Sequence, residues 1–193
     1  DADIHHMVNS PAYQLIVAHH SRMDAEVTTD GLTEVLSALQ AGESYTSASE
    51  RLRSVYSAYR VACNQVAVLQ KQTEHLVSPD LIQGAAAQAI DALPAQARLE
   101  ATVYLLADGR SRAYVVEEEK AIVLDILQAG TLRPQRFLAH EMHHIGADSL
   151  LPDPCPEPGL REALQEMTAM VQEGAATYLV DGWRGSPTAA DFE

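Results

Sequence analysis

The sequence predicts a helix-rich α+β protein that contains one small β-sheet. Three observations lead to this prediction. Apolar residues recur at helical spacing through about the first 95 residues, strand-forming residues cluster between about 99 and 128, and helical spacing returns from about 134 to 180. Because a chain of 193 residues can enclose one sizeable core, we expect a single domain over 1–193.

The N-terminal helical region, residues 1–95, begins with a helix predicted over 11–23. Asp30 is the expected N-cap of a second helix, because a short carboxylate side chain can accept the first free backbone N–H groups. Gly42 should end that helix, since glycine adopts the left-handed backbone conformation found just after helices.

A long amphipathic helix is predicted next, opened by Ser47 or Ser49 and running through Leu76. Its apolar residues follow a mixed three- and four-residue spacing, so one face should be buried. Ser78-Pro79 is a helix start with proline in the first turn, and predicts a further helix over 80–93.

The central segment predicts a sheet of about three strands, within 99–128. Residues 101–106 read A-T-V-Y-L-L and 121–127 read A-I-V-L-D-I-L, both rich in strand formers. Asp108-Gly109 is a turn signal, and 112–116 is a candidate return strand.

The last third predicts two helices, over 134–145 and 160–180, which together form the segment 134–180. The intervening stretch, 146–159, holds four prolines and is predicted to be a loop. We expect the tail, 181–193, to be loose, because it carries Gly and Pro.

Composition narrows the function classes. The net charge of −14 argues against nucleic acid and anionic membranes as partners. No apolar run reaches the ~18 residues needed to span a bilayer, so we expect no membrane insertion. The chain starts at Asp1 without a signal-peptide pattern, which leaves a cytoplasmic and a secreted location both open. Cys63 and Cys155 have no spacing that requires pairing.

The strongest functional signal is the segment H-E-M-H-H at residues 140–144, which matches H-E-x-x-H. Helical residues four apart lie on one face, so His140 and His144 can meet one Zn²⁺. Glu141 projects beside them, where a carboxylate can take a proton from a water molecule at the metal. The motif therefore predicts that a metal ion, a water nucleophile and a general base lie at one site.

A catalytic zinc usually takes three protein ligands, so a third is expected from elsewhere. The last helix offers Glu162, Glu166 and Glu173. Glu166 and Glu173 share a face but lie ~10 Å apart along the axis, so they cannot both bind one ion.

Glu173 lies in Q-E-G-A-A-T-Y-L, residues 172–179, and this segment resembles the third-ligand segment E-G-x-A-x-Y of aminopeptidase-N-like enzymes in the gluzincin clan. The resemblance implies a zincin-like fold in which Glu173 is the third zinc ligand. In those enzymes the gap between the second histidine and the glutamate is shorter than the 28 residues found here. That departure keeps Glu166 as the alternative ligand.

The segment L-A-H-E-M-H-H-I-G, residues 138–146, also resembles a bacterial family described as zinc-dependent peptidases. That family pairs an H-E-x-H-H-like helix with a later E-G-x-A helix, after N-terminal helices and strands. Its activity is itself mostly inferred, so it implies a gluzincin-like hydrolase and little about the substrate.

Several neighbours of the motif are candidates for supporting roles. His143 is an alternative ligand, although we favour a packing role or a contact with a ligand. The other ring nitrogens of the histidines need partners, and Asp148, Glu166 and Thr177 are candidates. Gly174 interrupts a helix at a cost of about 1 kcal/mol, which predicts close approach of the two zinc helices there. Tyr178 is expected to pack in the core.

Peptide hydrolysis also needs a donor for the oxyanion, and the sequence does not identify it. Tyr104 and Tyr114 lie near the predicted sheet and could face the cleft. Adjacent residues split across two helix faces, so the pairs His5-His6 and His19-His20 are poor bidentate clamps. We interpret these pairs as surface or fortuitous residues. Gluzincins often keep this donor after the glutamate ligand, and this chain continues only 20 residues past Glu173. The set is therefore either incomplete or completed by a segment outside this chain.

The sequence thus predicts a zinc-dependent hydrolase, with peptides or small amides and esters as substrates and Zn²⁺ as cofactor. Of the possible function classes, we favour a metallopeptidase. A zinc hydrolase or lyase for a small non-peptide substrate, and a metal-stabilised binding module without turnover, are the alternatives. Oligomeric state does not follow from the sequence.

Overall fold

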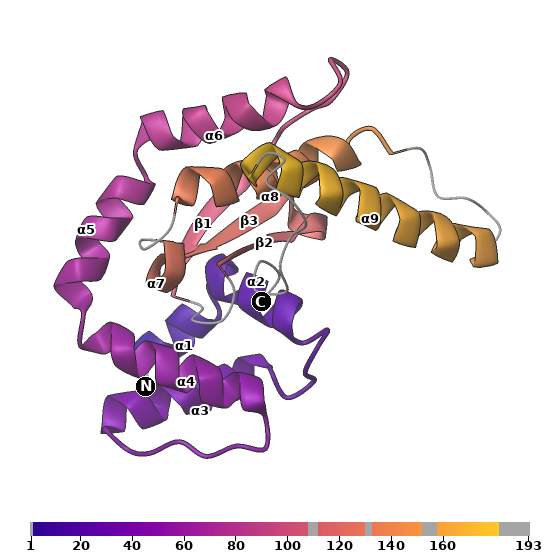
Figure 1. Cartoon of the computed structure of the whole chain (residues 1–193). Coiled ribbons are helices and arrows are strands. Elements are labelled where there is room, and N and C mark those ends of the chain that lie inside the picture. The colour runs from indigo at the N-terminus through magenta and orange to yellow at the C-terminus, as the bar shows by residue number, and fades with distance from the viewer. Residues whose placement is uncertain (1, 108–111, 130–132, 152–157, 182–193) are drawn as a thin grey trace.

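The computed structural model describes residues 2–107, 112–129, 133–151 and 158–181. Helices from both ends of the chain surround a three-stranded sheet (Figure 1). The prediction of a helix-rich α+β fold is confirmed. In the described part of the chain, no helix combines the length and apolar character needed to cross a membrane.

The first four helices share a core of their own, in which Ile16, Leu32 and Val55 are buried. They are α1 (Ala2–Val8), α2 (Pro11–His20), α3 (Thr29–Ala41) and α4 (Glu50–Cys63). The predicted cap of α3 is wrong by two residues, because the hydroxyl of Thr28 accepts the N–H of Gly31 and starts the helix before Asp30. Gly42 ends α3 in the left-handed conformation, with φ of 69°.

The single long helix predicted up to Leu76 is wrong, because the chain breaks between α4 and α5 (Val66–Leu76). Ser49 does cap α4, accepting the N–H of Leu52. Asn64 closes α4, and Gln65 has φ of −128° and ψ of 21°, outside the helical region. The physical reason is packing: α4 buries its side chains among the N-terminal helices, whereas Leu76 belongs to a second core beside the sheet. One straight helix cannot reach both.

The helix predicted after Ser78-Pro79 is α6 (Pro79–Asp91), and Ser78 caps it by accepting the N–H of Leu81. Small residues at Ala85 and Ala89, both fully buried, allow α6 to lie close to the helix that carries the histidine motif.

The sheet contains β1 (Thr102–Leu106), β2 (Ala113–Val116) and β3 (Ala121–Asp125), in the order β1-β3-β2. The pairing of β3 is parallel with β1 and antiparallel with β2. A short 3₁₀ helix, Glu117–Glu119, links β2 to β3. The predicted third strand is too long, because the carboxylate of Asp125 accepts the N–H of Leu127 and starts the short helix α7 (Ile126–Ala129).

Alternate residues of the strands face two different layers. Ile122 and Leu124 of β3 face the core formed with α6 and α8, whereas Val123 packs with Tyr114 and with Leu15 of α2. The strand β2 lies at an edge of the sheet. This edge positions the candidate site.

The two C-terminal helices are α8 (Pro134–Asp148) and α9 (Pro158–Asp181), which lie alongside one another (Figure 1). The predicted loop 146–159 is therefore too long, since α8 continues to Asp148 and α9 already begins at Pro158. The predicted loose tail lies outside the described residues, apart from its first residue, Asp181, which ends α9. The same holds for Asp108-Gly109 and Cys155, whereas Cys63 is exposed and unpaired.

Candidate metal centre

The helix α8 carries its motif beside a fully apolar face. Leu138, Ala139, Met142 and Ile145 are buried against α6 and the sheet. This packing fixes the rotation of α8. His140 and His144, one turn apart, are left partly exposed on the adjoining face.

The helix α9 places Glu173 beside the two histidines. Ala176, one turn after Glu173, is fully buried. Its small side chain allows α9 to approach α8. The packing role predicted for Gly174 is wrong, because a Cβ added there would meet nothing within 4 Å. Gly146 of α8 is the tighter position, since an added Cβ would lie 2.3 Å from Cδ1 of Leu93.

The three side chains form a compact triangle of ligand atoms. The Nε2 atoms of His140 and His144 are 3.0 Å apart. Oε2 of Glu173 lies 3.5 Å from Nε2 of His140, and Oε1 lies 3.4 Å from Nε2 of His144. Among the described residues, these three are the group of His, Cys, Asp or Glu side chains that could hold a metal ion.

This triangle fits zinc in both donor type and size. A tetrahedral Zn²⁺ with bonds of about 2.0–2.1 Å sets its ligand atoms about 3.3 Å apart. The nearest approaches between the three side chains, 3.0, 3.4 and 3.5 Å, are of this size, with one oxygen of Glu173 facing each histidine. Two imidazole nitrogens and one carboxylate are a common donor set for catalytic zinc, and they leave a fourth position for water or substrate. The role of the three residues as zinc ligands stays a prediction.

Glu141 is half-buried and lines the same site. Burial raises the pKa of the Glu141 carboxyl to about 8, and the negative charge of Glu173 adds to the increase. A bound cation would act in the opposite direction, because it favours the ionised carboxylate. Without a metal ion, the surroundings of Glu141 thus favour its protonated form at neutral pH.

Burial also lowers the pKa of the His144 imidazole, against an opposing effect from the charge of Glu173. A lowered pKa keeps the ring neutral, which is the form that binds a metal. His143 is buried, and its pKa is lowered by burial and then by the charge of His140. It does not belong to the ligand triangle, and its Nδ1 has no hydrogen-bond partner among the described residues.

A cleft of about 330 Å³ opens over the triangle. It lies between the edge strand β2, the helices α8 and α9, and the end of α2. Besides the triangle and Glu141, its lining includes His19, Ala113, Tyr114, Val115, Glu117, Asp148, Ala169 and Gln172.

The other predicted supporting residues are spread apart. Asp148 lines the cleft, accepts a 2.8 Å hydrogen bond from the amide of Gln172, and lies close enough to His144 to influence its pKa. Glu166 is exposed on α9 and lies outside the ligand triangle. Thr177 is half-buried and does not line the cleft. The predicted core position of Tyr178 is wrong, because this side chain is 62% exposed.

The sequence offered two tyrosines as residues that could face the cleft, and only one of them lines it. Tyr114 lines the cleft, whereas Tyr104 packs against the core under the sheet. The interpretation of His19-His20 as surface residues is wrong: His20 is 1% exposed, and His19 lines the cleft. No local sequence signal could have found His19, because its place in the cleft depends on how α2 packs against β2.

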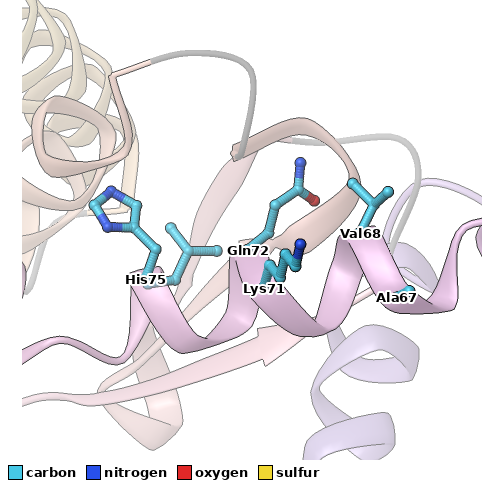
Figure 2. Close-up of a pocket in the computed structure, with 6 residues that line it drawn as sticks. Ala67, Val68, Lys71, Gln72 and His75 are labelled. Carbon is cyan, nitrogen blue, oxygen red and sulfur yellow. The ribbon is translucent and has the colours of Figure 1, made fainter.

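A separate hollow of about 310 Å³ runs along α5 (Figure 2). Figure 2 shows Val68, Gln72 and His75 rising from this helix. The lining is largely apolar, and none of its residues belongs to the ligand triangle. The candidate site is therefore the cleft beside β2, which contains the ligand triangle.

The fold and the site together define a class of protein: a helix-rich α+β chain in which two packed helices present a His-His-Glu group that could hold a metal ion. Residues 4–192 match the model of the family described as "Putative zinc dependent peptidase (DUF5700)". The chain belongs to this family, whose description implies zinc as cofactor and peptides as substrates. Comparisons with curated proteins and with solved structures find no match.

Proposed function

We propose that the protein is a gluzincin-type metallopeptidase in which His140, His144 and Glu173 hold Zn²⁺ and Glu141 is the general base. The observation that carries this proposal is the ligand triangle, with separations of 3.0, 3.4 and 3.5 Å, beside the half-buried side chain of Glu141. Membership of a family described as zinc-dependent peptidases supports the same conclusion.

Bound zinc would supply a Lewis acid that makes a water molecule acidic near neutral pH and polarises the substrate carbonyl. Glu141 takes the proton of the attacking water and then delivers it to the leaving nitrogen. Its raised pKa in the metal-free protein supports the second half of this cycle, because the protonated form is not strongly disfavoured. His140, His144 and Glu173 keep the reacting groups in register by fixing the metal.

The wall formed by β2 supports a peptide as the substrate. Ala113 and Val115 line the cleft from an edge strand, whose outer N–H and C=O groups can pair with an extended chain. Strand addition of this kind would align a peptide with the ligand triangle. The three-ligand group among the described residues also favours turnover over a purely structural site, which usually has four protein ligands.

Hydrolysis should depend on zinc. Zinc-loaded protein is expected to cleave an internally quenched fluorescent peptide library, protein treated with a chelator should be inactive, and added zinc should restore the rate. The reason is that Glu141 alone cannot deprotonate water fast enough at neutral pH. Equal cleavage by the metal-free protein, or no cleavage of the library by the zinc-loaded protein, would contradict the proposal.

Substrates with basic side chains should be preferred. Every charged side chain lining the described cleft is acidic, and two of them, Glu117 and Asp148, are not needed for the metal or for proton transfer. Exposed charge pairs contribute about 0.2–1 kcal/mol each, so a matched Lys peptide should exceed its Glu counterpart by about 3- to 10-fold in kcat/KM. High salt should reduce this ratio by screening.

The matched variants for this test are Glu117→Gln and Glu119→Gln. Both residues lie in the same exposed turn, but only Glu117 lines the cleft. Glu117→Gln should narrow the Lys-over-Glu ratio and Glu119→Gln should leave it unchanged. A ratio of one in the wild type, or equal effects of the two variants, would show that the cleft charges do not select the substrate.

A further inference from the structure

The cleft brings in a histidine that the metal motif does not include. His19, at the end of α2, lines the cleft together with the ligand triangle, although the two lie far apart in the sequence. Its ring stacks on that of Tyr114 in β2, with centroids 3.8 Å apart and an angle of 16° between the planes. This contact holds the imidazole in a defined orientation.

The position of α2 is secured on both sides of His19. Leu15, one turn earlier, is buried in a cluster with Tyr114 and Val123 of the sheet. Arg22, three residues later, forms an ion pair with Glu118 in the turn that follows β2. Both contacts tie the end of α2 to β2, so the placement of His19 does not depend on the stacking contact alone.

Hydrolysis at this site requires an N–H or O–H group for the oxyanion, and few groups in the described cleft can supply one. The ionised carboxylates only accept hydrogen bonds. One N–H of the Gln172 amide donates to Asp148, and this bond ties the side chain to the end of α8. His140 and His144 turn their Nε2 atoms toward Glu173. His19 and Tyr114 also line the cleft, and an imidazole N–H or a phenol O–H can donate a hydrogen bond.

Of these two, His19 is the better placed for substrate. Tyr114 is only 6% exposed and forms part of the core under the sheet. His19 is half-buried and covers one face of the Tyr114 ring, so its imidazole offers more surface to the cleft. The division of labour follows: the histidine touches the substrate, and the tyrosine supports the histidine.

We propose that His19 is the oxyanion donor of this enzyme and that Tyr114 is a positioning residue for it; the inference rests on the proposed peptidase function. As the water oxygen bonds to the carbonyl carbon, Glu141 receives the water proton and the carbonyl π electrons move to oxygen. That oxygen then accepts a hydrogen bond from the ring N–H of His19. When the oxygen electrons re-form the carbonyl, the C–N bond breaks and the leaving nitrogen takes the proton from Glu141.

The test begins with His19→Ala in the zinc-loaded protein. Loss of one oxyanion donor lowers kcat by about 100- to 1,000-fold, with little change in KM or in zinc content. His19→Gln, which keeps an N–H donor, should recover part of the rate. His6→Ala, at an exposed histidine of α1, is the control and should behave as the wild type. Wild-type kcat in His19→Ala would overturn the proposal.

Two variants of Tyr114 separate the roles of the pair. Tyr114→Phe keeps the stacking ring without the hydroxyl, so we expect kcat within about threefold of the wild type. Tyr114→Leu removes the stack and should lower kcat, with zinc content and thermal unfolding measured to verify the fold. A large loss in Tyr114→Phe, with His19→Ala near wild type, would assign the donor to Tyr114 and overturn the proposal.

A binding measurement supplies a readout that does not depend on turnover. A phosphonamidate peptide imitates the tetrahedral oxyanion, so calorimetry should show at least tenfold weaker binding to zinc-loaded His19→Ala than to wild type. Equal binding would count against His19. The two proposals fail differently: an inactive zinc-loaded wild type overturns both, whereas an active wild type that requires Glu141 but not His19 overturns this inference alone.

Discussion

Replacement of Glu141 by glutamine is expected to abolish hydrolysis while leaving zinc bound. Glutamine has nearly the same shape as glutamate, but its amide cannot take a proton from water. General-base catalysis contributes roughly 100- to 10,000-fold, so kcat of Glu141→Gln should fall by at least about 100-fold. The measurement is steady-state cleavage of a quenched peptide, made with zinc content determined on the same samples.

The fold should tolerate this substitution. Burial opposes the charge of Glu141, as its raised pKa indicates, so a neutral side chain there avoids a desolvation cost. Glu166→Gln is the control, because Glu166 is exposed on α9 and lies outside the cleft. A wild-type rate in Glu141→Gln would remove Glu141 as the base, and loss of zinc in the same variant would indicate that it acts as a ligand.

Replacement of Glu173 by alanine is expected to weaken zinc binding strongly. Mutation of a residue that only supports a ligand typically weakens metal binding 10- to 100-fold, so loss of a direct ligand in Glu173→Ala should exceed about 100-fold. The side chain of Glu173 is 57% exposed, so its truncation should not disturb the fold. Competition with a chromophoric chelator measures the zinc dissociation constant.

Glu166→Ala is the matched variant for this prediction. Glu166 was the alternative ligand from the sequence, and it lies two turns earlier on the same helix. We expect its zinc affinity to equal that of the wild type. Equal affinity in Glu173→Ala and the wild type would refute the ligand set, and a loss confined to Glu166→Ala would show that α9 presents a different turn to the histidines.

Most helices and all three strands could be predicted because their signals are local. Ser78-Pro79, Gly42 and the strand formers of 121–125 act through contacts within a few residues. The break between α4 and α5 could not be predicted, because the apolar spacing of the sequence continues across it. That break exists because the helices on either side pack into different cores.

The site shows the same contrast between residues that local spacing predicts and residues that tertiary packing places. The motif places His140, Glu141 and His144 on one helix, so their neighbourhood follows from helical geometry alone. Whether Glu166 or Glu173 faces them depends on how α9 packs against α8, which no spacing rule contains. His19 reaches the cleft only because α2 packs on the edge strand. The prediction that Gly174 marks a close approach of two helices was wrong, because helix propensity does not report which atoms lie opposite a residue.

The central claim is that two histidines of α8 and one glutamate of α9 hold a single zinc ion. The most direct test is X-ray diffraction from crystals of the zinc-loaded protein on both sides of the zinc absorption edge. We predict one anomalous peak, bonded to Nε2 of His140, Nε2 of His144 and a carboxylate oxygen of Glu173. A peak elsewhere, or one that Glu173 does not contact, would contradict the account.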